Sequence, residues 1–208
     1  MSHYGQVASQ SSRQDRTRQA IVAGAIETWA ENRAATLAQI AAAVGMGRST
    51  VHRYFPDRDE LLAAVDQECR RRFILATERA RPGEGRGLEA CHRLCEEYLG
   101  LGPVLGLIFA DNALVDPDSW STSHPAADDR PDGAEPGDGD PFVEAVVRGQ
   151  QDRSVDPRLP AGWAVTVLWM LLGAASLYFT AEHAPRRDVS TLLTRAVAGA
   201  VGTPPADG

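Results

Sequence analysis

The sequence contains no lysine, so arginine supplies all 21 of its basic side chains. Cysteine is also scarce, with three in 208 residues. Such an odd, low number argues against a disulfide-stapled secreted fold and favours a reducing compartment. The segment from Met1 to Asp15 is polar and rich in Ser and Gln, so we expect no secretory signal peptide there. These features together predict a cytoplasmic protein.

Motifs typical of enzymes and metal sites are missing as well. The sequence has no glycine-rich phosphate loop and no metalloprotease helix. Cys91 and Cys95 stand four residues apart with His92 beside them, which allows a metal-binding or redox-sensing cluster. A pair of small buried side chains is the favoured interpretation, because a tetrahedral site would lack a clear fourth ligand. The sequence therefore predicts no catalytic residue, no cofactor and no bound metal.

Long uncharged runs are rare, and the longest expected within one helix covers the 21 residues of 161–181. Its length alone would allow a membrane span. The run contains Thr166, Ser176 and Thr180, and no second run of this kind occurs. A helix that is apolar on all sides can instead be buried between its own core and a partner subunit. We therefore expect no membrane partner and keep a membrane-anchored helical protein as the least favoured alternative.

Charge is distributed unevenly along the chain. Residues 1–62 carry seven Arg and six acidic residues, a net charge of +1. Residues 63–208 carry fourteen Arg and 22 acidic residues, a net of −8, which completes the overall −7. An N-terminal part that escapes the general acidity is compatible with a polyanionic partner, whereas the acidic remainder is not expected to touch DNA.

Apolar residues recur at helical spacing, and no strand pattern rises above noise, so we predict an all-α fold. The expected helices cover residues 15–31, 37–44, 48–54, 58–80, 87–99, 103–114, 141–153, 161–184 and 187–201. Residues 1–14 are expected to form a disordered tail, and residues 203–208 a second tail. The segment 116–140 is rich in Pro, Gly and Asp, which predicts a flexible acidic loop.

Two of the short predicted helices suit a helix-turn-helix. They are joined by Gly45-Met46-Gly47, where Gly45 can adopt the positive φ of a sharp turn without steric cost. Val51 and Phe55 are four residues apart and mark the inner face of the second helix. Its outer face then presents side chains that suit base edges and phosphates in a major groove, namely Arg48, Ser49, His52 and Arg53.

The segment 36–61 resembles the DNA-binding signature of the TetR family of transcriptional regulators, and the resemblance covers about residues 15–62. The shared features are a Thr before the first short helix, an Ile-Ala pair, a Gly turn, and the Thr and aliphatic residue of a Thr-aliphatic-Tyr pattern on the second. The most distinctive part is Tyr54-Phe55-Pro56-Asp57-Arg58-Asp59-Glu60-Leu61, which places a further helix directly after the recognition helix. The sequence departs from the family pattern at Gly47, His52 and Arg58, where Ser, Tyr and Lys are usual.

The resemblance implies a role for each matching residue. Arg48 and Ser49 would read base edges, and His52 and Arg53 would contact either bases or phosphates. Phosphates would be held by the remaining polar positions, and the full predicted DNA-binding set is Thr36, Gly47, Arg48, Ser49, Thr50, His52, Arg53, Tyr54 and Arg58. A helix-turn-helix DNA-binding domain is thus predicted over residues 15–62.

Residues 63–202 are predicted to form a helical domain for dimerisation and ligand binding. The apolar helix over 161–184 and the amphipathic helix over 187–201 from each subunit would build a four-helix interface about a two-fold axis. A mainly apolar pocket for a small apolar or amphipathic effector is expected among Tyr98, Leu105, Phe109, Asn112, Trp120, Phe142, Trp163, Trp169 and Met170. The alternative for these residues is plain core and interface.

The resulting prediction is a homodimeric repressor that a small-molecule effector releases from a palindromic operator in double-stranded DNA. The alternative from a different class is a soluble helical ligand-binding protein without a DNA function.

Overall fold

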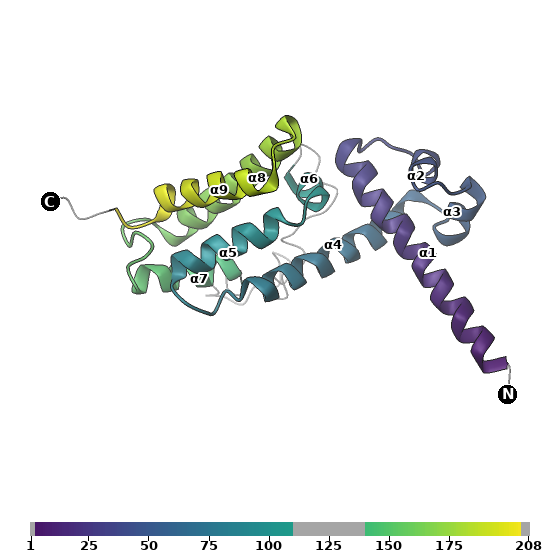
Figure 1. The fold of residues 1–208 in the computed structure, drawn as a ribbon, viewed down its shortest axis with the longest axis horizontal. Coiled ribbons are helices and arrows are strands. Elements are labelled where there is room, and N and C mark those ends of the chain that lie inside the picture. The colour runs from purple at the N-terminus through teal and green to yellow at the C-terminus, as the bar shows by residue number, and fades with distance from the viewer. Residues whose placement is uncertain (1–2, 110–139, 205–208) are drawn as a thin grey trace, which may run out of the picture.

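The structure is a computed structural model that describes residues 3–109 and 140–204. Regular secondary structure within these ranges is helical, as the sequence predicted. Figure 1 shows an elongated molecule in which α1 (His3–Glu31), α2 (Leu37–Ala43) and α3 (Arg48–Tyr54) form one end. The long helix α4 (Arg58–Ala80) connects this end to a bundle of the later helices.

Helix α1 begins much earlier than expected. The prediction of a disordered segment over 1–14 does not hold for residues 3–14, which continue the helix. The second half of α1 is anchored by its buried apolar side chains, among them Ile21, Ile26 and Trp29. No proline interrupts the preceding residues, and extending an existing helix costs far less than starting one. In Figure 1 the N-terminal half of α1 accordingly extends beyond the other helices.

The two short helices owe their boundaries to local capping. Thr36 caps α2, because its side chain accepts a hydrogen bond from the Gln39 backbone while the Gln39 side chain bonds back to the Thr36 backbone. Gly45 has a φ of 66°, the left-handed conformation that the turn requires. Gly47 precedes α3 and has no side chain to cap it. Helix α2 packs on α1 and α3 packs on α2, and the buried side chains here include Ile40, Ala41, Val51 and Phe55.

Helix α4 belongs to both ends of the molecule. Asp57 caps it by accepting a hydrogen bond from the Glu60 backbone N–H at 2.9 Å. Its first turns bury Leu61 and Val65, and its last turns bury Ala76 and Ala80. The same rigid helix therefore links the packing of the helix-turn-helix to the packing of the second bundle.

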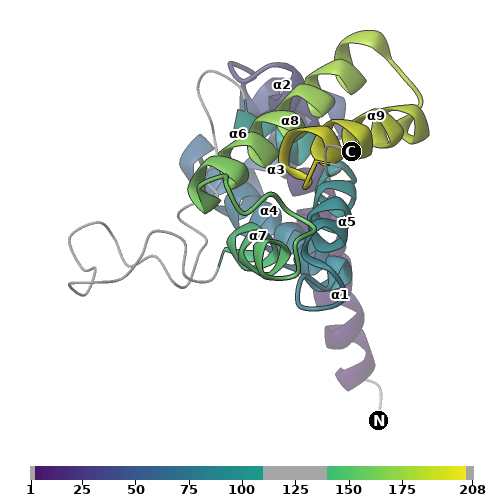
Figure 2. The ribbon, with the colours of Figure 1, turned by 90° about the vertical axis from the view of Figure 1, so that its left-hand side faces the viewer.

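The second bundle consists of α5 (Gly87–Leu99), α6 (Pro103–Phe109), α7 (Pro141–Gln151), α8 (Ala161–Glu182) and α9 (Arg186–Val201), seen along its length in Figure 2. Helices α5 and α7 cross so closely that a Cβ on Gly87 would collide with the Gly149 backbone. Helix α6 packs against α1, and Arg33 donates to the Gly106 carbonyl at 2.6 Å across this contact. The predicted loop 116–140 lies outside the described residues except for Asp140, which caps α7.

Helix α8 is long and apolar enough to cross a membrane by length and composition, but such a helix is weak support for a span. Its buried residues are Ala164, Val165, Leu168 and Leu172, which contact the rest of the bundle. The opposite side exposes large apolar side chains, most of all Leu177 at 71%. One side of α8 thus belongs to the core of this chain, and the opposite side is exposed.

Candidate DNA-contacting face and aromatic site

Helix α3 presents its polar residues outward, as the sequence predicted. Val51 is fully buried and fixes the orientation of the helix. Arg48, Ser49, His52 and Arg53 are exposed, whereas Thr50 and Tyr54 are half-buried at the edges of this face. Among the described residues, the Arg48 guanidinium has no hydrogen-bond or ion-pair partner, so its donors are available to a ligand.

Two side chains at the end of α3 have partners within the chain. The His52 Nδ1 lies 3.2 Å from the Pro56 carbonyl oxygen, which holds the ring over the turn after α3. The Arg53 guanidinium lies 5.5 Å from the centre of the Tyr54 ring, in cation–π geometry. These contacts hold Arg53 and Tyr54 beside each other at the edge of the exposed face.

Thr36 lies at the start of α2, and its hydroxyl is 3.1 Å from the Gln39 Oε1. The residue is exposed, so the hydroxyl remains accessible from outside while it caps the helix. The predicted phosphate role of Thr36 is compatible with this arrangement, because an oxyanion at the helix N-terminus would replace the Gln39 side chain.

Arg58 points inward, away from the role predicted for it. Its guanidinium donates to the carbonyls of Ala35 and Arg33 at 2.7 Å each and lies 4.6 Å from the centre of the Trp29 indole. It thereby ties the start of α4 to the loop before α2. The structure does not bring Arg58 together with the exposed side chains of α3, so Arg58 is not among the phosphate contacts that we propose.

Four of the residues predicted to line the effector pocket meet in an aromatic cluster at the centre of the second bundle. The Trp169 ring lies 5.4 Å from the Phe142 ring, 5.9 Å from Tyr98 and 6.0 Å from Phe109. Phe73 on α4 completes the cluster at 4.2 Å from Tyr98, and the sequence analysis missed it. Helices α4, α5, α6, α7 and α8 therefore each contribute one ring.

The cluster contains polar atoms as well. The Tyr98 hydroxyl lies 2.8 Å from the Thr77 hydroxyl, a second residue that the sequence analysis missed. Burial and the charge of Asp140 raise the pKa of the Tyr98 phenol above its usual range, and the hydrogen bond with Thr77 only partly opposes this. The Tyr98 hydroxyl therefore stays protonated at neutral pH and offers a hydrogen bond inside an apolar site.

Other predicted pocket residues lie elsewhere. Trp163 and Met170 are 61% and 60% exposed on the outer side of α8, so their assignment to a pocket was wrong. The helix is apolar on all sides, and periodicity alone could not show which side faces inward. Leu105 is fully buried in the core. Asn112 and Trp120 lie outside the described residues.

The cysteines lie in the core. Cys91 and Cys95 are both buried, and burial raises the pKa of the Cys91 thiol to about 12 and that of the Cys95 thiol further. A protonated, inaccessible thiol is neither a metal ligand nor a reactive nucleophile. In the part of the chain that the structure describes, no group of three or more His, Cys, Asp or Glu residues could hold a metal ion.

Comparison with known proteins agrees with this architecture. Residues 21–65 match the model of the bacterial regulatory proteins of the tetR family. The HTH-type transcriptional repressor LfrR of Mycolicibacterium smegmatis is 35% identical over 197 residues, which span 94% of this chain and 96% of that protein.

Solved structures give the same result. Crystal structures of LfrR from Mycobacterium smegmatis, alone and in complex with proflavine, both match with a TM-score of 0.62 at 31% identity. They cover 90% and 89% of this chain, and 97% and 96% of their own chains. The ketosteroid regulator KstR2 of Mycobacterium tuberculosis shares the fold at 13% identity, with a TM-score of 0.65 and coverage of 90% and 96%.

A helix-turn-helix joined by one long helix to a helical bundle, together with these matches, defines a DNA-binding transcriptional regulator. The chain belongs to the TetR family of bacterial transcriptional regulators.

Proposed function

We propose that this protein is a cytoplasmic homodimeric repressor that leaves a palindromic operator when a small molecule binds. The observation that carries the proposal is the exposed polar face of α3, with Arg48 at its first turn and Val51 anchored beneath it. The repressor LfrR, similar over nearly the whole chain, supports repression as the direction of control.

The dimensions of α3 suit a major groove. An α-helix with its side chains is about 10–12 Å across, and the major groove is about 12 Å wide. Side chains at the N-terminal end of a recognition helix contact base edges, so Arg48 and Ser49 are the proposed readers. Thr36, Thr50 and Tyr54 flank them as proposed phosphate contacts, and Arg53 and His52 lie at the far end of the same face.

The first prediction concerns the proposed reader. Substituting Arg48→Ala should weaken binding to the operator by about 1–3 kcal/mol and reduce discrimination between operator and unrelated DNA, because a bidentate contact to a base is lost. Fluorescence anisotropy with labelled duplexes at several salt concentrations measures both effects.

Arg187→Ala is the matched control, because this Arg side chain is 92% exposed on α9, away from the helix-turn-helix. It should leave operator binding unchanged. An Arg48→Ala variant with unaltered affinity and specificity would remove Arg48 from the interface. A wild-type protein that bound no DNA duplex would contradict the proposed function as a whole.

We propose that the effector is a planar aromatic compound that inserts into the aromatic cluster. The stacked rings of Phe73, Tyr98 and Trp169 offer flat apolar faces, and the Tyr98 hydroxyl offers one polar contact. The Asp140 carboxylate is close enough to influence Tyr98, so a positively charged ring system would gain electrostatically. The structure of LfrR with proflavine, a similar protein with a bound aromatic compound, supports this ligand class.

The second prediction tests this site with proflavine as the probe. Asp140→Asn should weaken proflavine binding roughly tenfold, because it removes the negative charge while Asn still caps α7. Trp169→Ala should weaken it further, whereas Trp163→Ala should have no effect because that indole is exposed on the same helix. Proflavine fluorescence titrations measure all three, and equal losses for the two Trp variants would refute the assignment.

A further inference from the structure

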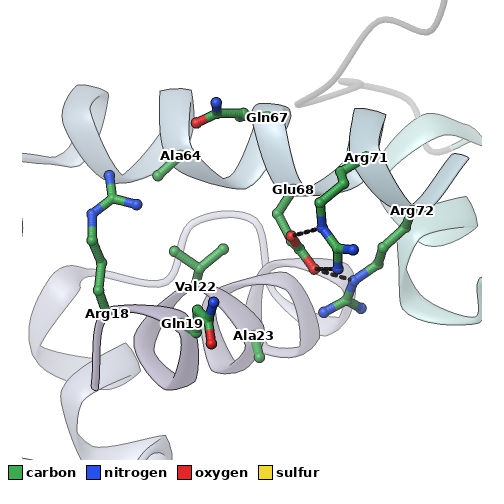
Figure 3. A pocket seen from close by; sticks show the side chains of 9 residues that line it. All are labelled: Arg18, Gln19, Val22, Ala23, Ala64, Gln67, Glu68, Arg71 and Arg72. Atoms are coloured by element: carbon green, nitrogen blue, oxygen red, sulfur yellow. Dashed lines mark hydrogen bonds and ion pairs between the residues drawn. The ribbon is translucent and has the colours of Figure 1, made fainter. Parts of the chain in front are cut away.

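A groove lies between α1 and α4, at the junction of the two ends of the molecule. It is an open groove of about 630 Å³ in which residues of α1 face residues of α4 (Figure 3). Its volume falls within the range of small-molecule sites. The lining residues are Arg18, Gln19, Val22, Ala23, Ala64, Gln67, Glu68, Arg71 and Arg72.

The charge of the groove is positive. Three guanidinium groups and one carboxylate line it, and the carboxylate, that of Glu68, pairs with Arg71 and Arg72 (Figure 3). Hydrogen bonds from Arg71 and then Arg72, despite partial burial, lower the pKa of Glu68 to about 2, so it is ionised at neutral pH. The four charged side chains therefore leave a net charge of +2 in an otherwise acidic protein.

The guanidinium groups also retain unused donors. Arg72 donates to Glu68 through its Nε at 2.8 Å, and within the described residues its two terminal nitrogens have no partner. Arg71 uses its Nε and one terminal nitrogen on the same carboxylate. Arg18 stands on the opposite helix, where its guanidinium lies 4.9 Å from the centre of the Phe55 ring. In Figure 3, Arg18 lies toward one end of the groove, near Ala64, and Arg71 and Arg72 lie toward the other end. Forked donors at both ends suit an anion that lies along the groove.

The floor of the groove is apolar. Val22 and Ala64 are only 4% and 5% exposed, and Ala23 lies beside them. The carboxamides of Gln19 and Gln67 supply neutral hydrogen-bonding groups at the edges. A ligand that fits this lining has an acidic group for the arginines and a small apolar body for the floor.

We propose that the α1–α4 groove is a binding site for a small organic anion, held between Arg18 on α1 and Arg71 and Arg72 on α4. The site is separate from the aromatic cluster, because a rotation of 100° per residue places Phe73 on the opposite side of α4 from Gln67 and Arg71. An anion that bridges α1 and α4 would bind differently to any state in which the two helices shift, so it would alter operator affinity. The binding itself does not depend on the DNA-binding function.

Salicylate is a suitable probe, since it combines a carboxylate with a small apolar ring, and neutral salicylamide is its matched control. Isothermal titration calorimetry of the full chain at constant ionic strength should detect salicylate and not salicylamide. Arg18→Gln should weaken salicylate binding at least threefold, and Arg72→Gln should do the same without removing the Arg71–Glu68 pair. Glu68→Gln should strengthen binding about twofold to fivefold, because it removes the one opposing charge.

Arg79→Gln serves as the control on α4, since Arg79 pairs with Glu97 outside the groove. It should leave salicylate binding unchanged. Thermal melts establish that each variant is folded, and Arg18→Gln and Arg72→Gln provide independent tests from opposite walls. Salicylate binding that neither Arg variant reduces, or that Glu68→Gln does not strengthen, would overturn the proposal. The proposal would also fail if the wild type bound no salicylate and both Arg variants lost operator affinity. That result would make the groove part of the DNA interface.

Discussion

At the scale of single residues, Arg58 shows why a motif does not fix the direction of a side chain. Its guanidinium holds two loop carbonyls and covers the Trp29 indole. The Ala35 carbonyl also accepts the Trp29 Nε1–H at 3.0 Å, so one oxygen joins three parts of the helix-turn-helix domain. The position of Arg58 in the motif was clear from the sequence, but the carbonyls that compete for its donors come together only in the fold.

The third prediction follows from these contacts. Arg58→Ala should lower the free energy of unfolding by about 2 kcal/mol, because two hydrogen bonds from a charged donor are lost and a carbonyl is left unpaired. Urea unfolding followed by Trp fluorescence measures the change. Arg53→Ala, an exposed arginine five residues earlier, should change it by less than about 0.5 kcal/mol. Equal stability of the two variants, with a reduced salt dependence of DNA binding for Arg58→Ala, would restore the phosphate role.

At the scale of elements, the start of α5 depends on a loop far along the chain. The Asp152 carboxylate accepts the Gly87 backbone N–H at 2.8 Å, and the Ser154 hydroxyl accepts the Leu88 N–H at 3.0 Å. These donors are the free amides that begin any helix and are usually satisfied by the preceding residue. Here the α7–α8 loop satisfies them, so the crossing of α5 and α7 and the beginning of α5 are fixed together.

The fourth prediction is a pH-dependent loss of this cap. Asp152→Ala should destabilise the fold by about 1 kcal/mol at pH 7, the usual value of a helix cap. Partial burial raises the pKa of Asp152, but hydrogen bonds from Ser154 and Gly87 outweigh it, and the folded pKa is lowered. The stabilisation is therefore present above the unfolded pKa of about 3.9 and lost as the pH falls through the folded value.

Urea unfolding of wild type and Asp152→Ala between pH 7 and pH 3 measures this effect. The difference between the two proteins should shrink below about pH 4. Glu78→Ala, an exposed acidic residue on α4, is the control and should show no such dependence. A constant difference over the whole range would mean that the carboxylate charge of Asp152 does not contribute.

The sequence predicted elements better than it predicted faces. Residues 48–54 and 58–80 were expected as helices, and α3 and α4 have those bounds. The signals that set them, the Gly turn before α3 and the Asp57 cap before α4, lie in the neighbouring residues of the sequence. In α8, apolar residues occur on every side, so periodicity gives no inward direction. Trp163 and Met170 were consequently placed in the pocket, while Phe73 was not among the predicted pocket residues. Which rings meet is decided by five helices packing together.

At the scale of the whole molecule, the outer side of α8 carries a regular seam. Exposed residues recur at spacings of three or four, as Trp163, Thr166, Met170, Ala174, Leu177 and Ala181. This spacing is that of a helix which packs along a neighbouring helix. Helix α9 packs against α8, and its Leu192 is also 51% exposed. A second copy of the chain is the partner that such a surface fits, because a two-fold axis pairs the same surface with itself.

The fifth prediction connects this seam to DNA binding. Leu177→Arg places a charge at the most exposed apolar residue of the seam, so it should convert the dimer that we propose into a monomer, as measured by size exclusion with light scattering. Two recognition helices about 34 Å apart bind one palindrome together, so the monomer should also lose most of its operator affinity. Ile74→Arg, which adds the same charge at an exposed apolar residue of α4, should change neither property. A Leu177→Arg protein that stayed dimeric would move the interface away from α8, whereas a monomer with full operator affinity would separate dimerisation from DNA recognition.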